Sequence, residues 1–584
     1  MKYSIIPIRS FLLFIFTVLL AAACKKDNAD YTYDYRRITD AVKSSNVRLV
    51  NLSKNNQLIA NGDSLTNFFV PPQRSGNIPP GELTPPGTRY FPKDGFLGQT
   101  WPVPQGLFRK DGKADLKTTF ISTITNIVPS REVTFSIKDN DEQPKDYYLL
   151  VNHQSLVQNP TDLLEVPRSI TAPSKPDHFK IRILNLSRKI APTYTVEDLF
   201  TKLSLVYADG TPVSTATSGI ASNTWSEYVE VPYGTYQFKV LTDDGRQVPA
   251  AGQTYYNYID RFTSTMQMTG PGFSTVNSGL TYAPIRTFQP GGVYTIVIHP
   301  ADFIWTTNTD DVKTIQNGFR IISDVSEPQN VTYTQVQLAN TVIGQDLVLK
   351  VKGQSSPVTA YGTASEYKRV VAGKQVLEVL SKTGQTLLSK EVELLGGQNY
   401  TFWVYTDQDK QVKSLLAANN LAGTSYIGSG KDGTNSTIDR YQSEYYFNFR
   451  FLNFSSQLPY VTFTNGDGLP YAKNLANGSG VNEQLGILKT DEPYASVLYG
   501  TTASGGYYQF MAYSSAPARV PGDWLKQITP LSSESLVANK SLYTAVGRKV
   551  PAHEPGVYSI AVIGDPDKNS SAEKAKFMVI KHTK

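Results

Sequence analysis

The clearest pattern of apolar and polar positions along the chain is a short string that recurs at domain-sized intervals. It reads VRLVNLS at 47–53, IRILNLS at 181–187 and FRFLNFS at 449–455, with a weaker copy, VQLANT, at 336–341. Side chains alternate between the two faces of a strand, and in these strings both faces carry apolar residues. We therefore expect each string to form a strand that is buried on both sides.

Two further elements recur between these strings. SEYVEVPYG at 226–234 is similar to SEYKRVVAG at 365–373. Apolar strands opened by a glycine-containing turn then follow as GGVYTIVI, GGQNYTFWVY and PGVYSIAVI, with PSREVTFSI at 129–137 as the expected equivalent in the first interval. Short strands rich in β-branched and aromatic residues, bounded by Gly, Pro, Asn and Asp, are typical of β-sandwiches. The pattern predicts an all-β protein of about four tandem sandwiches.

The three elements in this order resemble the domain of unknown function 4397 (DUF 4397). This is an immunoglobulin-like β-sandwich module of bacterial surface lipoproteins and secreted proteins, and it is matched best by LVLKVKG, YGTASEYKRVVAG and GGQNYTFWVY within 331–445. The resemblance implies a fold and a surface location, and it carries no catalytic residue to transfer. The expected immunoglobulin-like domains are 46–175, 176–330, 331–445 and 446–584.

The N-terminus has the pattern of an export signal. Lys2 and Arg9 precede an apolar run that leads to Cys24, the one cysteine of the sequence. This run is shorter than the roughly 20 residues that a membrane-spanning helix needs. LLAAACKKDNAD resembles the signal and charged tether of Bacteroidetes surface lipoproteins, which implies a signal peptide at 1–23, lipidation of Cys24 and a tether at 24–45. Several acyl chains would anchor the protein firmly in the outer membrane.

Composition and charge narrow the classes of function. Among 584 residues, 35 Tyr, 35 Pro and 42 Gly favour strands and turns over helices. The net charge is +6, of which Lys2 and Arg9 lie in the predicted leader, leaving +4. Without a dense run of Lys and Arg, a nucleic-acid partner is not expected.

The polar residues within the recurring string have a structural interpretation. The Asn near its end can bond backbone groups where the strand becomes a loop; these residues are Asn51, Asn185, Asn340 and Asn453. The Arg in its second position is replaced by Gln337 in the weak copy. We interpret this Arg as a structural residue whose aliphatic stem packs and whose guanidinium is paired, with ligand contact as the alternative. These residues are Arg48, Arg182 and Arg450.

Residues 71–104 hold nine prolines and are expected to form a long insertion loop in the first domain. An aromatic loop on a sandwich can present a binding site, or its rings can instead pin the loop to its own domain. The candidate ligand-binding residues of this loop are Arg89, Tyr90, Phe91 and Trp101. Trp225 and Trp524 are further candidates, for stacking against a carbohydrate, with packing as the alternative.

Acidic pairs that follow the expected closing strands are weak candidates for calcium binding, because Asp is also ordinary in turns and no complete oxygen shell is visible. They are Asp139, Asp141, Asp407, Asp409, Asp565 and Asp567. No other cofactor is expected. Five His residues stand singly, and the sequence has no GxSxG string. Carboxylates from distant loops could still converge for glycosidic cleavage.

The sequence therefore predicts a lipid-anchored, end-to-end rod of sandwiches on the outer surface of a Gram-negative bacterium. Binding, adhesion or scaffolding without catalysis is the expected function. Glycan capture for a polysaccharide uptake system is one alternative, and a glycoside-processing enzyme is a less favoured one. The expected partners are the membrane, through the lipid, and a glycan or a surface protein.

Overall fold

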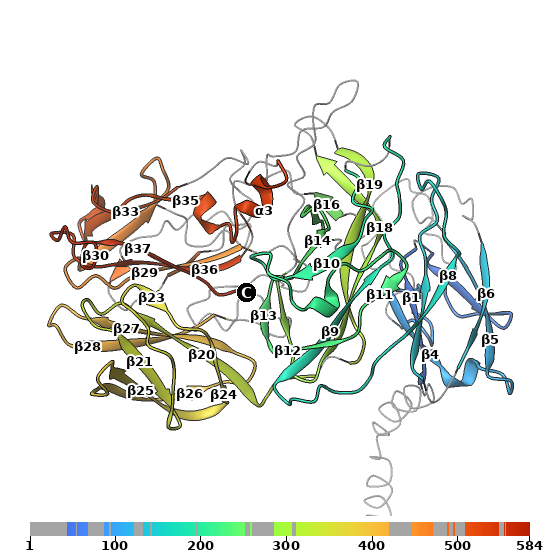
Figure 1. Ribbon diagram of the computed structural model, residues 1–584, viewed down its shortest axis with the longest axis horizontal. Coiled ribbons are helices and arrows are strands. Elements are labelled where there is room, and N and C mark those ends of the chain that lie inside the picture. The colour runs from blue at the N-terminus through green and yellow to red at the C-terminus, as the bar shows by residue number, and fades with distance from the viewer. Residues whose placement is uncertain are drawn as a thin grey trace, which may run out of the picture. The chain divides into compact units, whose positions relative to one another are not determined.

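The computed structural model describes much of the chain from residue 44 onward (Figure 1). The described residues are 44–53, 55–67, 87–92, 95–121, 132–139, 143–193, 197–250, 257–259, 285–306, 311–326, 328–419, 447–470, 488–489, 494–496, 509–547, 550, 554 and 556–584. They fall into two compact units, the first comprising Met1–Asn152 with Pro160–Ser169 and the second His153–Asn159 with Ile170–Lys584. Nearly every described element is a strand, which confirms the predicted all-β fold.

The first sandwich forms the first unit and has two four-stranded sheets, ordered β4-β1-β7-β8 and β3-β2-β5-β6. Its core lies between them and contains Leu49, Leu116 and Tyr147. Its elements are β1 (Ser44–Asn51), β2 (Gln57–Ala60), β3 (Asp63–Ser64), β4 (Thr100–Pro104), η2 (Gln105–Leu107), β5 (Lys113–Thr119), β6 (Val133–Lys138), β7 (Lys145–Leu149) and β8 (Leu163–Pro167).

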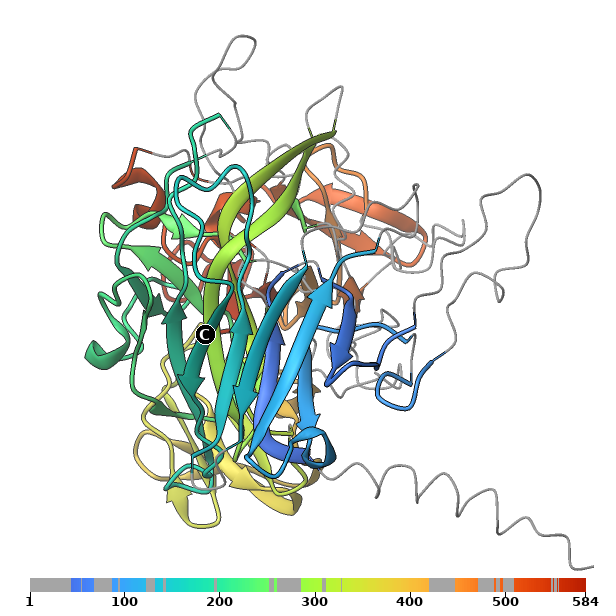
Figure 2. The ribbon, with the colours of Figure 1, turned by 90° about the vertical axis from the view of Figure 1, so that its right-hand side faces the viewer.

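The second sandwich opens the second unit. Its largest sheet joins β9 to β11, β12 and β18, with β16 and β19 beyond, and it packs on the sheets β10-β14-β15 and β13-β17. The long β18–β19 hairpin is prominent in Figure 2. The elements are β9 (His178–Asn185), β10 (Leu203–Val206), η3 (Thr215–Thr217), β11 (Thr224–Trp225), β12 (Val229–Pro232), β13 (Gly234–Tyr236), β14 (Lys239–Thr242), β15 (Gln247–Val248), β16 (Asn257–Ile259), β17 (Arg286–Phe288), β18 (Val293–Thr306) and β19 (Asp311–Ser323).

The third sandwich packs a sheet of order β23-β20-β27-β28, with β24 also on β20, against the sheet β22-β21-β25-β26. Its strands are β20 (Tyr333–Asn340), β21 (Leu347–Val351), β22 (Gln354–Ser355), β23 (Thr363–Ala364), β24 (Lys368–Val371), β25 (Gly373–Ser381), β26 (Thr386–Leu394), β27 (Asn399–Thr406) and β28 (Val412–Ala418).

The fourth sandwich packs the sheet β32-β29-β36-β37 against the sheet β31-β30-β33-β34, with β35 also on β33. Its elements are β29 (Phe447–Asn453), β30 (Tyr460–Thr464), β31 (Leu488–Lys489), β32 (Tyr494–Ser496), β33 (Gln509–Ala516), β34 (Arg519–Trp524), β35 (Leu531–Ser532), η5 (Ser533–Leu536), α3 (Ser541–Thr544), β36 (Gly556–Ile563) and β37 (Lys576–Lys581).

The recurring string forms the equivalent strand in every sandwich. Strands β1, β9, β20 and β29 each pair in parallel with a later strand, namely β7, β18, β27 and β36. Their middle residues are at most 1% exposed and lie in the four cores, which confirms the prediction of buried strands. These residues are Leu49, Ile183, Leu338 and Phe451. In the first sandwich, PSREVTFSI at 129–137 was expected to form the strand equivalent to β18, β27 and β36, and this prediction was wrong. The parallel partner of β1 is β7, and VTFSI forms β6 in the opposite sheet.

The recurring Asn ends each of these strands, as predicted. In the third sandwich, Nδ2 of Asn340 donates to the carbonyls of Gln345 and Thr359, and its Oδ1 accepts from the N–H of Val342. Asn453 repeats this pattern, with a bond from Nδ2 to the carbonyl of Leu458 and one from the N–H of Ser455 to Oδ1. Each side chain thus satisfies backbone groups in the loop that its strand enters.

The third and fourth sandwiches are not separate units, so the expectation of end-to-end sandwiches is wrong for this pair. A buried cluster is shared between β27 and β28 of one and β29, β36 and β37 of the other, and Figure 1 shows these sheets facing each other. Within the cluster, the rings of Trp403 and Phe454 stack with centroids 5.0 Å apart. The outer faces of these sheets therefore form a second core, in which the apolar cluster lies beside buried polar side chains.

Candidate functional site

The recurring Arg lies on the outer face of its sheet, and in the first sandwich it joins a buried ion-pair cluster. The side chains of Arg48 and Asp146 are 8% and 0% exposed, respectively. Nε and Nη2 of Arg48 donate to the two carboxylate oxygens of Asp146 at 3.0 and 2.6 Å. Nε of Arg168 lies 2.9 Å from the same carboxylate. This bidentate pairing fixes β1 against β7.

In the second sandwich the equivalent residue, Arg182, is 2% exposed. Its Nε donates to Oγ1 of Thr295 at 2.9 Å, and its guanidinium lies 4.5 Å from the centre of the Tyr228 ring. Buried Asp324 accepts hydrogen bonds from the hydroxyls of Tyr228 and Thr295 at 2.9 and 2.5 Å. Burial, reinforced by the charge of Asp324, raises the pKa of Tyr228, so this phenol stays neutral.

In the third and fourth sandwiches the equivalent residues belong to one shared network. Nε2 of Gln337 donates to Oγ1 of Thr401 at 2.8 Å, and Nδ2 of Asn419 donates to the same oxygen at 2.6 Å. Arg450, which is 1% exposed, crosses the interface and donates to Oδ1 of Asn419 at 2.7 Å and to the carbonyl of Ala418. The repeated polar position thus joins two sandwiches instead of facing solvent.

Strand register explains why these groups meet. The residue directly opposite the recurring position on the parallel strand is polar in every sandwich. This second residue is in turn paired with a residue of the following antiparallel strand. Two positions after that paired residue, every sandwich has a third polar residue. The four sets are Arg48, Asp146 and Arg168; Arg182, Thr295 and Asp324; Gln337, Thr401 and Asn419; and Arg450, Ser559 and His582. Sequence reasoning identified only the first member of each set, although a polar residue after Tyr in VYT, NYT and VYS marked the second member in three of them.

The aromatic insertion loop packs mainly on its own domain. Phe91 and Trp101 are 8% and 5% exposed, belong to the first core and have ring centroids 5.5 Å apart. Tyr90 packs partly against the same core, and the exposed Arg89 lies over its ring at 5.7 Å. The interpretation of Phe91 and Trp101 as exposed ligand contacts is therefore wrong, because burying their apolar surface fastens the loop to the core. Residues 68–86 lie outside the described residues.

The two other candidate tryptophans differ in exposure. Trp225 is half-buried on β11, where it pairs with Leu184 of β9. Trp524 is 40% exposed on the edge strand β34 and stands directly opposite Tyr513 of β33. Directly paired residues of antiparallel strands share one face of the sheet. Trp524 and Tyr513 therefore lie on the same face of the sheet, and Trp524 is accessible to a ligand.

The acidic pairs lie at turns where the structure describes them. Oδ1 of Asp407 accepts from the N–H of Gln411 at 2.8 Å, and Oδ1 of Asp565 accepts from the N–H of Asp567 at 2.9 Å. Asp409 is exposed, Asp139 is half-buried, and Asp141 lies outside the described residues. Among the described residues, no group of three or more His, Cys, Asp or Glu side chains is placed to hold a metal ion.

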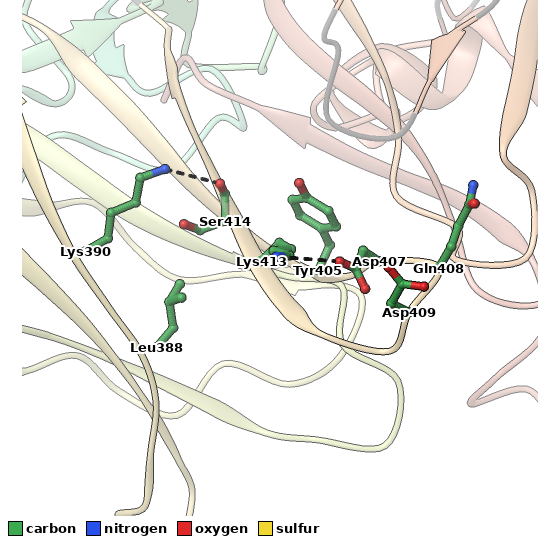
Figure 3. A pocket seen from close by; sticks show the side chains of 8 residues that line it. All are labelled: Leu388, Lys390, Tyr405, Asp407, Gln408, Asp409, Lys413 and Ser414. Atoms are coloured by element: carbon green, nitrogen blue, oxygen red, sulfur yellow. Dashed lines mark hydrogen bonds and ion pairs between the residues drawn. The ribbon is translucent and has the colours of Figure 1, made fainter.

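A hollow of about 580 Å³ lies on the third sandwich between β26 and the end of β27 with β28 (Figure 3). Lys413 and Asp407 approach each other within 3.8 Å along its wall, and Nζ of Lys390 donates to the carbonyl of Ser414 at 3.4 Å. Its lining residues are Leu388, Lys390, Tyr405, Asp407, Gln408, Asp409, Lys413 and Ser414. Both signs of charge line this open site, which suits a small ligand that carries hydroxyl groups or mixed charge.

A buried ion pair joins the second and fourth sandwiches, and sequence reasoning missed it. Lys239 of β14 and Glu554 are 1% and 0% exposed and are in direct contact. Oε2 of Glu554 also accepts from the N–H of Ala538 at 2.8 Å, and nearby Lys581 donates to Oε1 of Gln237 at 3.0 Å. Neither residue is among the positions that the recurring elements share, so the repeats did not mark them.

Comparison with known proteins adds little to this geometry. No family model matches the chain, and no curated protein matches it. One similar solved structure is the crystal structure of a candidate cell adhesion protein from Bacteroides uniformis. It is 9% identical, the match covers 41% of this chain and 98% of that chain, and the TM-score is 0.11. Such a likeness defines no function for this chain.

The predicted lipidation site, Cys24, lies outside the described residues. Among the residues that the structure describes, none of the helices has the length and apolar character required to pass through a membrane.

Proposed function

We propose that this chain is a lipid-anchored, non-catalytic binding protein of the outer bacterial surface, which serves adhesion or scaffolding. The observation that carries the proposal is the sealed interface between the third and fourth sandwiches. Arg450, Trp403 and Phe454 are at most 2% exposed there. A double layer of sandwiches resists bending more than a flexibly linked pair, so the loops at its ends keep fixed positions. Fixed loops on a rigid body suit recognition of another surface.

The leader and tether supply the second support for this proposal. LLAAACKKDNAD resembles a lipoprotein signal followed by the charged tether of surface-displayed lipoproteins. Acylation at Cys24 would hold the sandwiches at the membrane, with the tether between lipid and first domain. The proposed location is the outer leaflet of the outer membrane, and the proposed partner is a surface protein or a glycan.

Experiments on cells test the proposal. Protease added to intact cells should remove the protein, and Cys24→Ser should abolish incorporation of labelled fatty acid and release the protein from the membrane fraction. Cells that carry the protein should then adhere to a host or bacterial surface better than a deletion strain does. Full protection from protease in intact cells, or equal adherence of both strains, would contradict the proposal.

Glycan capture is a second candidate function, and the accessible Trp524 beside Tyr513 favours it. An exposed indole ring offers an apolar face to the C–H groups of a sugar. The ion pair between Arg519 and Asp523, at 2.7 Å, supplies polar groups at the end of the same strand. A glycan array should show binding that Trp524→Ala removes and Val520→Ala retains. Absence of any bound glycan would eliminate this candidate.

A further inference from the structure

His582 occupies the centre of the polar network between the third and fourth sandwiches. It follows β37, is 5% exposed and is held by a bond from its own N–H to the carbonyl of Val557. Its imidazole Nε2 lies 2.7 Å from Oγ of Ser559 in the fourth sandwich. On the other side, Nδ1 lies 3.0 Å from the hydroxyl of Tyr367 and 3.2 Å from Nε2 of Gln337, both in the third sandwich. The ring therefore bridges the two domains with both nitrogens.

The neighbours of the ring determine its protonation. The amide nitrogen of Gln337 can only donate, and it gives one hydrogen to Thr401 and the other to Nδ1 of His582. Nδ1 must therefore accept, so the ring hydrogen is on Nε2 and is donated to Oγ of Ser559. The neutral imidazole satisfies both sides, whereas a proton on Nδ1 would meet the N–H of Gln337 and would need the hydroxyl of Tyr367 as its acceptor.

The described elements around His582 contribute no negative charge that would stabilise a protonated imidazole. Strand β20 contributes Gln337, β27 contributes Thr401 and the end of β28 contributes Asn419, all uncharged. Of the described residues in this network, Tyr367 and Arg450 are the titratable ones besides His582. Burial raises the pKa of Tyr367, so this phenol carries no negative charge near neutral pH, and Arg450 of β29 is itself a cation. Lys581, next to His582 in sequence, donates to Gln237 instead.

We propose that His582 controls an acid-sensitive latch, so that uptake of a proton by its imidazole separates the third and fourth sandwiches at their shared face. Protonation breaks the bond to Gln337 and places a second cation beside Arg450 in a buried site. Separation lets water reach both cations and exposes the apolar cluster that includes Trp403 and Phe454. The latch is independent of the partner that the protein binds.

The sign of the pH dependence follows from the two states. Burial and the charge of Arg450 hold the pKa of His582 well below its ordinary value of 6.5 in the closed interface. In the open state the ring is solvated and regains an ordinary pKa. The open state therefore gains population as the pH falls below about 6.5, by up to about tenfold per pH unit. The gain ends once the pH passes the depressed pKa of the closed state.

Accessibility of a thiol within the interface tests the latch in the full chain. Ala417 is 3% exposed and belongs to the shared apolar cluster, so Ala417→Cys places a small thiol at the closed face. Ala114→Cys, at a fully buried position in the core of the first sandwich, is the matched control. Labelling with dithiodipyridine is followed between pH 7.5 and 5 in detergent and divided by the rate of a free peptide thiol.

The expected result is a labelling rate at the Ala417→Cys site that rises by up to about tenfold per pH unit below 6.5, while the control site stays protected. Adding His582→Gln should make the rate independent of pH, and His153→Gln should leave the rise intact. Should His582→Gln prevent folding, Arg450→Gln replaces it, and the rise should end at a higher pH, because loss of this neighbouring charge raises the pKa of His582 in the closed state. A chain without the acid rise, or one whose rise is unchanged in both variants, would overturn the latch.

Discussion

Arg450 in the fourth sandwich donates from Nη1 to Oδ1 of Asn419 in the third, across 2.7 Å. The same position holds Arg48 and Arg182 in the first two sandwiches, where the head contacts groups of its own domain. The same position thus contacts its own domain in the first two sandwiches and joins two domains in the fourth. This reuse explains how two repeats can share one buried face.

Loss of Arg450 should therefore weaken the interface as well as the fourth sandwich. Arg450→Ala leaves Oδ1 of Asn419 and the carbonyl of Ala418 buried without this donor, and removes a packed stem. We expect a destabilisation of about 2–4 kcal/mol, seen as a lower midpoint of thermal unfolding. Arg519→Ala is the control: the side chain of Arg519 is 64% exposed, and its removal should cost no more than about 0.5 kcal/mol.

The strand-ending Asn should be sensitive to loss of its amide donor. Asn340 bonds two loop carbonyls through Nδ2 and one backbone N–H through Oδ1. Asn340→Asp keeps the acceptor and should cost about 1–3 kcal/mol in the free energy of unfolding, and Asn340→Ala should cost more. Denaturant titration of the two variants compares them. Equal stability of Asn340→Asp and the parent chain would show that the loop does not depend on the donor.

The predictable part of the fold lies in the repeated strings. Alternation predicted the burial of Leu338 and Phe451, and local hydrogen-bonding chemistry predicted the role of Asn340, because both depend on neighbours in sequence. The apolar outer face of the string FRFLNFS, with Leu452 and Phe454, also signalled a second buried surface. It could not indicate that a third-sandwich residue such as Trp403 would cover it, since that depends on contacts far apart in the chain.

The candidate site was harder to predict. Phe91 and Trp101 have the composition of an exposed binding loop, but composition cannot tell a ring that meets solvent from one that folds back on its own core. The partners of the recurring Arg were missed for a similar reason. Asp146 lies in the short, charged string KDYYL, which lacks the glycine turn of the other parallel strands, and only the register of β7 brings it to Arg48.

Tryptophan replacement should separate loop anchoring from ligand contact. Trp101→Ala removes a ring that is 5% exposed and packs against Phe91, so it should cost about 3–5 kcal/mol. Trp524→Ala removes a ring that is 40% exposed and should cost much less. Thermal unfolding of the two variants, followed by calorimetry, makes the comparison. Similar losses in both would mean that Trp524 is as firmly packed as the loop anchor.

The buried pair of Lys239 and Glu554 should make the contact between the second and fourth sandwiches sensitive to strong acid. Burial tends to raise the pKa of Glu554, but the charges of Lys239 and Lys581 and the bond from Ala538 outweigh it, so the pKa is lowered from 4.5. A carboxyl with a lowered pKa stabilises the folded state above its ordinary pKa, and this stabilisation is lost as the pH falls from about 4.5 through the folded value.

Glu554→Gln should remove that acid dependence and should itself cost about 3–5 kcal/mol, because Lys239 keeps a buried charge without a counter-charge. Lys239→Met combined with Glu554→Gln should regain much of the loss, and unfolding midpoints at pH 7 and pH 3.5 measure both effects. If the single variant matched the parent chain in stability at pH 7, the pair would not fasten the two sandwiches.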